Sequence, residues 1–195
     1  MERDFEGFSK AVRLVMQEAA RGALSGVHGP VSKLIRVEDR YTTAIETALG
    51  AAMQNIIVDD EASGKAAIQL LKRRDAGRAT FLPLSTVTGR RLSEPSLANM
   101  PGYVGVASEL AQTDGRYQGI LENLLGRTVI AETLDNAIAM ARKTGNRVRI
   151  VTLDGQVMNP GGSMTGGSSA KSAGVLSRAN ELKRLEQERE KLLDT

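Results

Sequence analysis

A glycine-rich segment at residues 159–167, Asn-Pro-Gly-Gly-Ser-Met-Thr-Gly-Gly, has the residue types and spacing most suggestive of a binding function. Its two glycine pairs lie five residues apart. Because glycine has no Cβ, such pairs allow the main chain to approach a phosphate, another strand or a second copy of the chain. A flexible loop is the simpler alternative.

Phosphate binding can be tested against known loop patterns. A Walker A loop requires Gly, four residues, and then Gly-Lys-Ser/Thr. Lys171 and Ser172 supply the end of that pattern, but Thr165 and Ala170 occupy both glycine positions. A dinucleotide loop needs a glycine fingerprint that opens a helix, and residues 162–174 lack the apolar helical period that should follow. The pattern therefore favours close contact between protein chains over nucleotide binding.

Composition restricts other chemistry. The absence of cysteine excludes disulfides, thiolate zinc sites and a cysteine nucleophile, and a single histidine, His28, excludes any site that needs two imidazoles. Ser163 and Ser169 have no evident general base. The acids of 59–61 are explained by a helix start, where carboxylates complement the dipole. We therefore expect no catalytic residue, no metal ligand and no cofactor.

Size and charge leave several classes open. The chain has 195 residues, 41% of them hydrophobic, which suffices for one ordinary domain or two small ones. Aromatic residues are scarce, so stacking surfaces for single-stranded bases are hard to build. A net charge of +3 permits a nucleic-acid partner without requiring one. No apolar run has membrane-span length and no signal-peptide core is seen, so we expect a cytosolic protein without membrane contact.

Both ends of the chain have helical periodicity. Residues 1–21 and 175–193 carry apolar side chains at alternating steps of three and four, which predicts two amphipathic helices with heptad spacing. We expect them to pack on each other in antiparallel fashion, as a piece of a longer coiled coil, because neither shows a clear outer end. Two ordinary terminal helices packed on the domain are the alternative.

An internal repeat lies between these helices. The order helix, strand, helix, strand occurs twice, with the opening helices ending at Gly50 and Gly126. The predicted segments are 55–58, 60–74 and 78–84 in the first copy, and 128–131, 134–143 and 147–153 in the second. A strand at 103–107 precedes the second copy, and a helix at 117–125 opens it. Asp154-Gly155 predicts a hairpin that pairs 156–158 with 149–151, so the glycine segment leaves from a strand at the margin of a sheet.

Three motifs resemble one family. They are 29–37 (Gly-Pro-Val-Ser-Lys-Leu-Ile-Arg-Val), 41–50 (Tyr-Thr-Thr-Ala-Ile-Glu-Thr-Ala-Leu-Gly) and the glycine-rich segment. Together they resemble the hinge domain of bacterial SMC (structural maintenance of chromosomes) proteins over residues 20–175. The resemblance implies an α+β fold of two related subdomains of mixed sheet and packed helices, flanked by an antiparallel coiled-coil pair. The implied divisions are a coil end at 1–22, subdomain I at 23–90, a linker at 91–102, subdomain II at 103–173 and a coil start at 174–195.

The resemblance also implies a function. SMC hinges are homodimers that join two coiled-coil arms in chromosome condensation and segregation. Their ATPase heads, kleisin and accessory subunits act through other parts of the protein, at the nucleoid. The family's dimer contact matches Gly161, Gly162, Met164, Gly166 and Gly167. Its weak, nonspecific DNA contact matches Lys171, Arg178, Lys183 and Arg184.

Alternatives remain open at this point. The same duplicated unit could serve as a protein-interaction domain of another coiled-coil protein, or as a nucleotide-binding domain. The basic clusters at 72–74 and 90–91 are interpreted as solvated surface, since charges near a helix end commonly stabilise that end.

Overall fold

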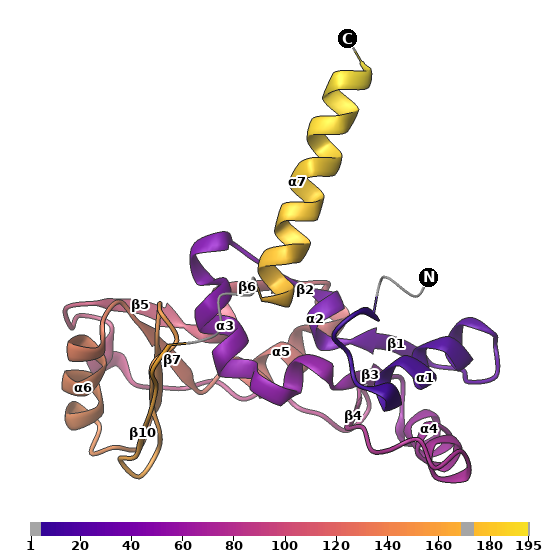
Figure 1. Cartoon of the computed structure of the whole chain (residues 1–195). Coiled ribbons are helices and arrows are strands. Elements are labelled where there is room, and N and C mark those ends of the chain that lie inside the picture. The colour runs from indigo at the N-terminus through magenta and orange to yellow at the C-terminus, as the bar shows by residue number, and fades with distance from the viewer. Residues whose placement is uncertain (1–4, 169–173, 195) are drawn as a thin grey trace. The chain divides into compact units, whose positions relative to one another are not determined.

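The computed structural model describes residues 5–168 and 174–194. Helices and strands alternate along the chain (Figure 1), which confirms the mixed α+β class. The chain divides into two compact units, neither of them continuous in sequence. Unit 1 comprises Met1–Ile35, Ala51–Gly89 and Thr113–Asn123, and unit 2 comprises Arg36–Gly50, Arg90–Gln112 and Leu124–Thr195.

Unit 1 is built on a three-stranded sheet with the order β1-β3-β4. Its strands are β1 (Val27–Pro30), β3 (Ile56–Val58) and β4 (Phe81–Pro83). β3 pairs antiparallel with β1 and parallel with β4. The helices α1 (Lys10–Ala20) and α4 (Glu61–Arg73) pack together and share one core with β3. The short α2 (Val31–Leu34) and η6 (Gly115–Tyr117), with most of α5 (Gln118–Leu125), complete the unit.

The N-terminal helix uses its apolar face inside unit 1. Phe8, Val12 and Val15, which belong to the predicted heptad seam, are buried in the cluster that contains Leu70 and Leu71 of α4. α1 is therefore part of the core of its unit, as the alternative of an ordinary packed helix predicted. Pairing of the two chain ends into an antiparallel coiled coil stays a prediction.

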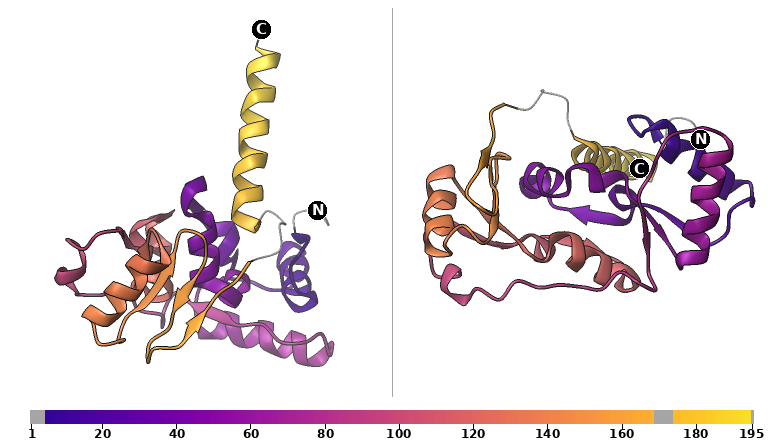
Figure 2. Two further views of the ribbon diagram at one scale, coloured as in Figure 1. Left: turned by 60° about the vertical axis from the view of Figure 1, so that its left-hand side comes forward. Right: turned by 90° about the horizontal axis from the view of Figure 1, so that it is seen from below.

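Unit 2 is built on a five-stranded sheet with the order β10-β9-β8-β7-β5. Its strands are β5 (Tyr103–Val106), β7 (Thr128–Ala131), β8 (Arg149–Thr152), β9 (Val157–Met158) and β10 (Met164–Thr165). Only β7 and β8 pair in parallel. The helix α6 (Leu134–Lys143) covers this sheet, and both views of Figure 2 show it beside the strands. Val129, Ile150 and Met140 fill the core between them.

Unit 2 also contains two further helices and several short 3-10 turns. They are α3 (Thr42–Leu49), the 3-10 turns η2 (Asp39–Tyr41), η4 (Pro95–Leu97) and η5 (Ala107–Glu109), and α7 (Val175–Leu193), yellow in Figure 1. A two-stranded sheet pairs β2 (Ile35–Val37) with β6 (Ala111–Thr113). The turn η3 (Gly50–Gln54) leads from α3 to β3.

The internal repeat is confirmed at the level of its elements. Each copy contains a parallel strand pair joined by a helix, β3-α4-β4 in one and β7-α6-β8 in the other, as parallel strands require a crossover. The opening helix of each copy, however, is assigned to the unit of the other copy, since α3 belongs to unit 2 and most of α5 to unit 1. The contiguous subdomains expected at 23–90 and 103–173 stay a prediction of how the hinge divides.

Candidate functional site: an open sheet edge and a basic pocket

The glycine-rich segment forms a hairpin at the margin of the unit 2 sheet. β10 pairs antiparallel with β9, with Met164 opposite Met158, and has no strand on its other side among the described residues. The Asn159 N–H donates to the Ser163 C=O at 2.8 Å. Because hydrogen-bonded and non-hydrogen-bonded pairs alternate, the N–H and C=O of Met164 point toward the open edge. The Met164 side chain is 55% exposed.

The glycines shape this hairpin. Gly161, Gly162 and Gly167 have φ values of +91°, +101° and +133°, a region that favours glycine. The Gly161 N–H also donates to the Asn146 C=O at 2.8 Å, which ties the turn to the loop after α6. These three glycines are therefore favoured by the local backbone, in addition to any close approach by another molecule.

Gly166 has a different reason to lack a side chain. The Gln156 amide forms a two-way clamp with the next residue, since its Oε1 accepts from the Gly167 N–H at 2.8 Å and its Nε2 donates to the Gly167 C=O at 2.9 Å. A Cβ at Gly166 would collide with the Gln156 carboxamide. The clamp therefore holds the end of β10 against the start of β9.

A second open edge belongs to unit 1. β4 is the last strand of its sheet, and the Ile56 N–H donates to the Thr80 C=O while the Leu84 N–H donates to the Val58 C=O, both at 2.9 Å. The alternation leaves the N–H and C=O of Phe81 facing outward. The next outward residue is Pro83, which has no N–H and is tolerated in a sheet only at such an edge.

An apolar cleft lies beside this edge. It has a volume of about 330 Å³ and is lined by residues of α4, of β4 and of the segment just before β4: Glu61, Gly64, Lys65, Ile68, Gln69, Ala79, Phe81 and Pro83. The side chain of Ile68 in this lining is 53% exposed. Unit 1 therefore presents unpaired backbone groups next to an exposed apolar side chain.

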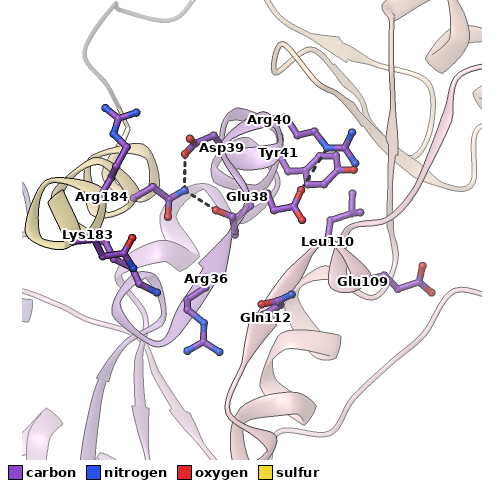
Figure 3. Close-up of a pocket in the computed structure, with 13 residues that line it drawn as sticks. Arg36, Glu38, Asp39, Arg40, Tyr41, Glu109, Leu110, Gln112, Lys183 and Arg184 are labelled. Carbon is purple, nitrogen blue, oxygen red and sulfur yellow. Dashed lines mark hydrogen bonds and ion pairs between the residues drawn. The ribbon is translucent and has the colours of Figure 1, made fainter. Parts of the chain in front are cut away.

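A basic pocket lies at the root of α7 in unit 2. It has a volume of about 650 Å³, and Figure 3 shows its lining side chains. The cations are Lys183 and Arg184 of α7, Arg36 of β2 and Arg40 of η2, and the acids are Glu38, Asp39 and Glu109. Arg40 contacts Glu38 at 3.6 Å, but both side chains are about 70% exposed, so this ion pair adds little stability.

Asn180 fixes the helix to the pocket wall. Its Nδ2 donates to the Val37 C=O at 2.7 Å and to Asp39 Oδ1 at 2.9 Å, the dashed lines beside α7 in Figure 3. Residues 180, 183, 184 and 187 recur at helical spacing and therefore share this face. The pocket is thus held together by a polar anchor at the base of the helix.

The sequence-predicted DNA residues separate in the structure. Lys183 and Arg184 line the pocket, whereas Arg178 is exposed and is not among its lining residues. Lys171 lies outside the described residues. Sequence reasoning missed Arg36 and Arg40, because no helical spacing connects them with α7. The Arg36 position lies within the family motif at 29–37, which was the only available signal.

Two polar contacts position α3 against its neighbours in unit 2. Arg149 Nη1 donates to the Ala48 C=O at 2.7 Å and so satisfies a carbonyl at the end of α3. Burial lowers the pKa of Arg149 from its ordinary value. Glu46 of the same helix accepts from the Leu176 N–H at 2.7 Å and so binds the first turn of α7.

His28 makes a structural network within unit 1. Its Nε2 lies 2.5 Å from Asp59 Oδ1 and its Nδ1 lies 2.8 Å from the Tyr117 hydroxyl. These contacts join β1, the end of β3 and η6. Across residues 5–168 and 174–194, no group of three or more His, Cys, Asp or Glu side chains could hold a metal ion. None of the helices in these ranges has both the length and the apolarity needed to cross a membrane.

Comparisons with known proteins identify this fold. A duplicated α+β unit from which a long helix emerges is the fold of SMC hinge domains. The family model described as "SMC proteins Flexible Hinge Domain" matches residues 24–141, more than half of the chain. The chain therefore belongs to the SMC hinge family, as its motifs predicted. The matched range ends before the glycine-rich segment.

Individual relatives agree with this assignment. The chain is 46% identical over 186 residues to the chromosome partition protein Smc of Bacillus subtilis, which covers 93% of this chain and 16% of that protein. It is 42% identical over 172 residues to the Smc protein of Lactiplantibacillus plantarum, covering 87% of this chain and 14% of that protein. The chain thus spans about a sixth of the length of these relatives.

Solved structures also match. An asymmetric dimer of the Geobacillus stearothermophilus SMC hinge domain aligns with a TM-score of 0.91 and 44% identity, covering 100% of this chain and 78% of that one. The Pyrococcus furiosus SMC hinge domain aligns with a TM-score of 0.69 and 30% identity, covering 89% and 88% of the two chains.

Proposed function

We propose that this chain is a homodimerisation hinge that joins two SMC coiled-coil arms. The observation that carries the proposal is the pair of open strand edges, β10 in unit 2 and β4 in unit 1. The Geobacillus stearothermophilus hinge domain, a close structural match, is described as a dimer. A dimer contact through Met164 and the four glycines places the free edge of β10 at the interface.

The two edges are complementary when they belong to different molecules. Each offers unpaired backbone N–H and C=O groups, which a partner strand satisfies by extending the sheet. The exposed Met164 side chain is matched to the apolar cleft around Ile68, because flexible methionines fill irregular apolar gaps well. In a two-fold dimer, β10 of each copy pairs with β4 of the other, so the contact is made twice.

Cysteine cross-linking tests this pairing directly, because the chain contains no cysteine of its own. We expect the double variant Ile68→Cys/Met164→Cys to form a covalent dimer with a short bismaleimide at micromolar protein concentration. Each single variant should remain largely uncross-linked. It carries one cysteine per copy, and the cysteines of the two copies then lie in different contacts of the dimer.

The matched control moves one cysteine off the edge. Glu188→Cys/Met164→Cys pairs the same β10 position with an exposed site on α7 and should yield no covalent dimer. Efficient cross-linking of Met164→Cys alone would mean that β10 pairs with β10, and would contradict the β10–β4 arrangement. A monomer under all conditions would contradict the proposal as a whole.

A second proposed role is weak DNA contact at the basic pocket beside α7. Lys183, Arg184, Arg36 and Arg40 support it, because several cations from different segments converge on one surface. Binding of this kind contacts phosphates, so it is nonspecific in sequence and weakens steeply with salt. Retention of duplex binding at high ionic strength would contradict this role.

The parent protein's other functions lie outside this chain. We propose that ATP hydrolysis, kleisin binding and accessory-subunit binding belong to other parts of a longer Smc protein, and that the hinge itself carries no catalytic step. The relatives' role in chromosome partition supports a location at the nucleoid. A long coiled coil on both sides of this chain, with ATPase motifs at the far ends, would separate this proposal from an unrelated coiled-coil interaction domain.

A further inference from the structure

A second basic pocket lies in unit 2 and is not explained by dimerisation or by the root of α7. It has a volume of about 670 Å³ and is lined by Arg90, Arg91, Leu92, Ser93, Glu94, Arg127, Arg147 and Val148. Its four cations are all arginines, and its only carboxylate is Glu94. Positively charged side chains therefore outnumber negatively charged ones in the lining of this pocket.

Three separate segments build this pocket. The Leu92 N–H donates to the Gly126 C=O at 2.7 Å, which places the 90–94 segment beside Arg127. Arg127 and Arg147 each lie just before one of two adjacent parallel strands, β7 and β8, whose register pairs Thr128 with Arg149. The positions of the arginines are therefore set by the sheet and by a backbone hydrogen bond.

The charges of the pocket are only partly compensated. Glu94, whose side chain is 18% exposed, contacts Arg147 at 3.2 Å, and the Arg147 Nε donates to the Thr144 C=O at 2.8 Å. Arg147 is thereby oriented by two contacts. Arg90 and Arg127 have no ion pair with any residue in the described part of the chain. Two exposed guanidinium groups thus remain available to an anion, at backbone positions that the sheet and the Leu92–Gly126 hydrogen bond determine.

We infer that this arginine pocket is a second phosphate-binding site, and that it takes the phosphodiester backbone of a nucleic acid. The guanidinium fork matches phosphate oxygens in bidentate geometry and is weakly hydrated, so arginine suits phosphate better than lysine does. The apolar lining is limited to Leu92 and Val148, which does not suit an apolar ligand. The volume lies within the range of ligand clefts, about 300–1,000 Å³.

The inference rests on the proposed function only in choosing nucleic acid as the source of the phosphates. Dimerisation and the α7 pocket use other residues, so each can fail separately. The same phosphate chemistry occurs in small polyphosphates. The experiment therefore includes inorganic triphosphate as a separate arm.

The test compares three charge-neutralising variants of this 195-residue chain. Arg90→Gln/Arg127→Gln removes the available arginines of the pocket and leaves the Glu94–Arg147 contact. Lys183→Gln/Arg184→Gln alters the pocket beside α7. Lys72→Gln/Arg73→Gln is the matched control, because it removes two exposed cations from unit 1 that line neither pocket.

The readout is fluorescence anisotropy of a labelled duplex of about 30 base pairs, at several salt concentrations. We expect Arg90→Gln/Arg127→Gln to weaken binding severalfold and to lower the slope of log K against log salt by about 2, one for each lost phosphate contact. The control should change both quantities less. Circular dichroism and solution mass confirm that each variant is folded and retains the parent's oligomeric state.

The outcomes separate the two claims. If Lys183→Gln/Arg184→Gln weakens binding and Arg90→Gln/Arg127→Gln behaves as the control does, the arginine pocket is overturned while the α7 pocket stands. If Arg90→Gln/Arg127→Gln weakens binding and Lys183→Gln/Arg184→Gln behaves as the control does, the arginine pocket is supported and the proposed DNA contact at the α7 pocket is contradicted. If the parent chain does not bind duplex at low salt, or if triphosphate binds the arginine pocket without competing with DNA, the inference is overturned.

Discussion

Glu46 Oε1 accepts a hydrogen bond of 2.7 Å from the backbone N–H of Leu176, so a side chain of α3 caps the first turn of α7. The first N–H groups of a helix have no hydrogen-bond partner within the helix and carry a partial positive charge. A carboxylate accepts a hydrogen bond from these groups and also balances the charge. Gly174, just before the helix, has no Cβ, and one built there would collide with the Glu46 carboxylate. The Thr42 and Ser177 hydroxyls, 2.9 Å apart, add a second contact. The emerging helix is therefore fixed at its base.

Removal of this cap should loosen the base of α7. We expect Glu46→Ala to lower the free energy of unfolding by about 1–3 kcal/mol, since a buried donor loses a charged acceptor. Hydrogen exchange should accelerate at the amides of 176–178. The control is Glu188→Ala, an exposed acid on the same helix, which should change stability by no more than about 0.5 kcal/mol. Unchanged exchange in Glu46→Ala would show that the cap is dispensable.

The leucines of α7 should differ sharply in how much each contributes to the stability of the fold. Leu176 is 3% exposed and Leu185 is 51% exposed. We expect Leu176→Ala to destabilise by about 2–5 kcal/mol, through lost burial and a residual cavity. Leu185→Ala should stay within about 0.5 kcal/mol. Denaturant unfolding of the two variants measures the contrast, and an equal loss would mean that the outer part of α7 packs on the domain.

The glycine at 166 should be required only because of Gln156. We expect Gly166→Ala to lower the melting temperature and to weaken dimerisation, because its Cβ meets the Gln156 carboxamide. Gln156→Ala loses the clamp on Gly167 but opens the space. The double variant should therefore be no less stable than Gln156→Ala alone, a non-additive result typical of residues in contact. Additive losses would place the steric conflict elsewhere, and Ser163→Ala is the neutral control.

Asp60 should give unit 1 an acid-sensitive component of stability. Its carboxylate accepts from the Ser63 N–H at 2.8 Å at the start of α4, and this hydrogen bond lowers the pKa of Asp60 from its ordinary value. The folded pKa lies below the unfolded one. The contribution is therefore fully present above the unfolded pKa and is lost as pH falls through the folded pKa, in the range below about pH 4.

The matched variant is Asp60→Asn, which keeps a capping oxygen but does not titrate. In thermal melts from pH 6 to pH 3, the parent should have a higher melting temperature than the variant at pH 6. The difference between the two melting temperatures should become smaller toward pH 3. A constant difference across this range would contradict the assignment.

Local patterns predicted most elements of the fold. The helices at 134–143 and 175–193, the strand at 128–131 and the Asp154-Gly155 hairpin were all found as expected, because each depends on nearby residues only. The assignment of α3 and α5 to the other unit was not predictable. It depends on which surfaces bury their apolar faces together, and periodicity carries no information about that choice.

In the candidate sites, too, local sequence patterns predicted some residues, whereas others come together only through the fold. Met164 and the glycines were placed correctly at a sheet margin, but the sequence could not show that Gln156 and the positive φ values already require those glycines. Lys183 and Arg184 could be assigned to one helix face, whereas Arg36 and Arg40 join them only through the fold. Arg90 and Arg91 were interpreted as solvated surface. Arg127 and Arg147 turn that surface into a pocket, through contacts distant in sequence.

The most direct test of the central claim is the molecular mass in solution at low micromolar concentration, measured on the parent chain and on Met164→Pro. Proline at this position removes the outward N–H of β10, while the inward hydrogen bonds of the hairpin come from its neighbours. We expect twice the chain mass of 20.9 kDa for the parent and the single-chain mass for the variant, with Met164→Leu remaining dimeric. A parent of 20.9 kDa, or a Met164→Pro variant that remains fully dimeric, would contradict it.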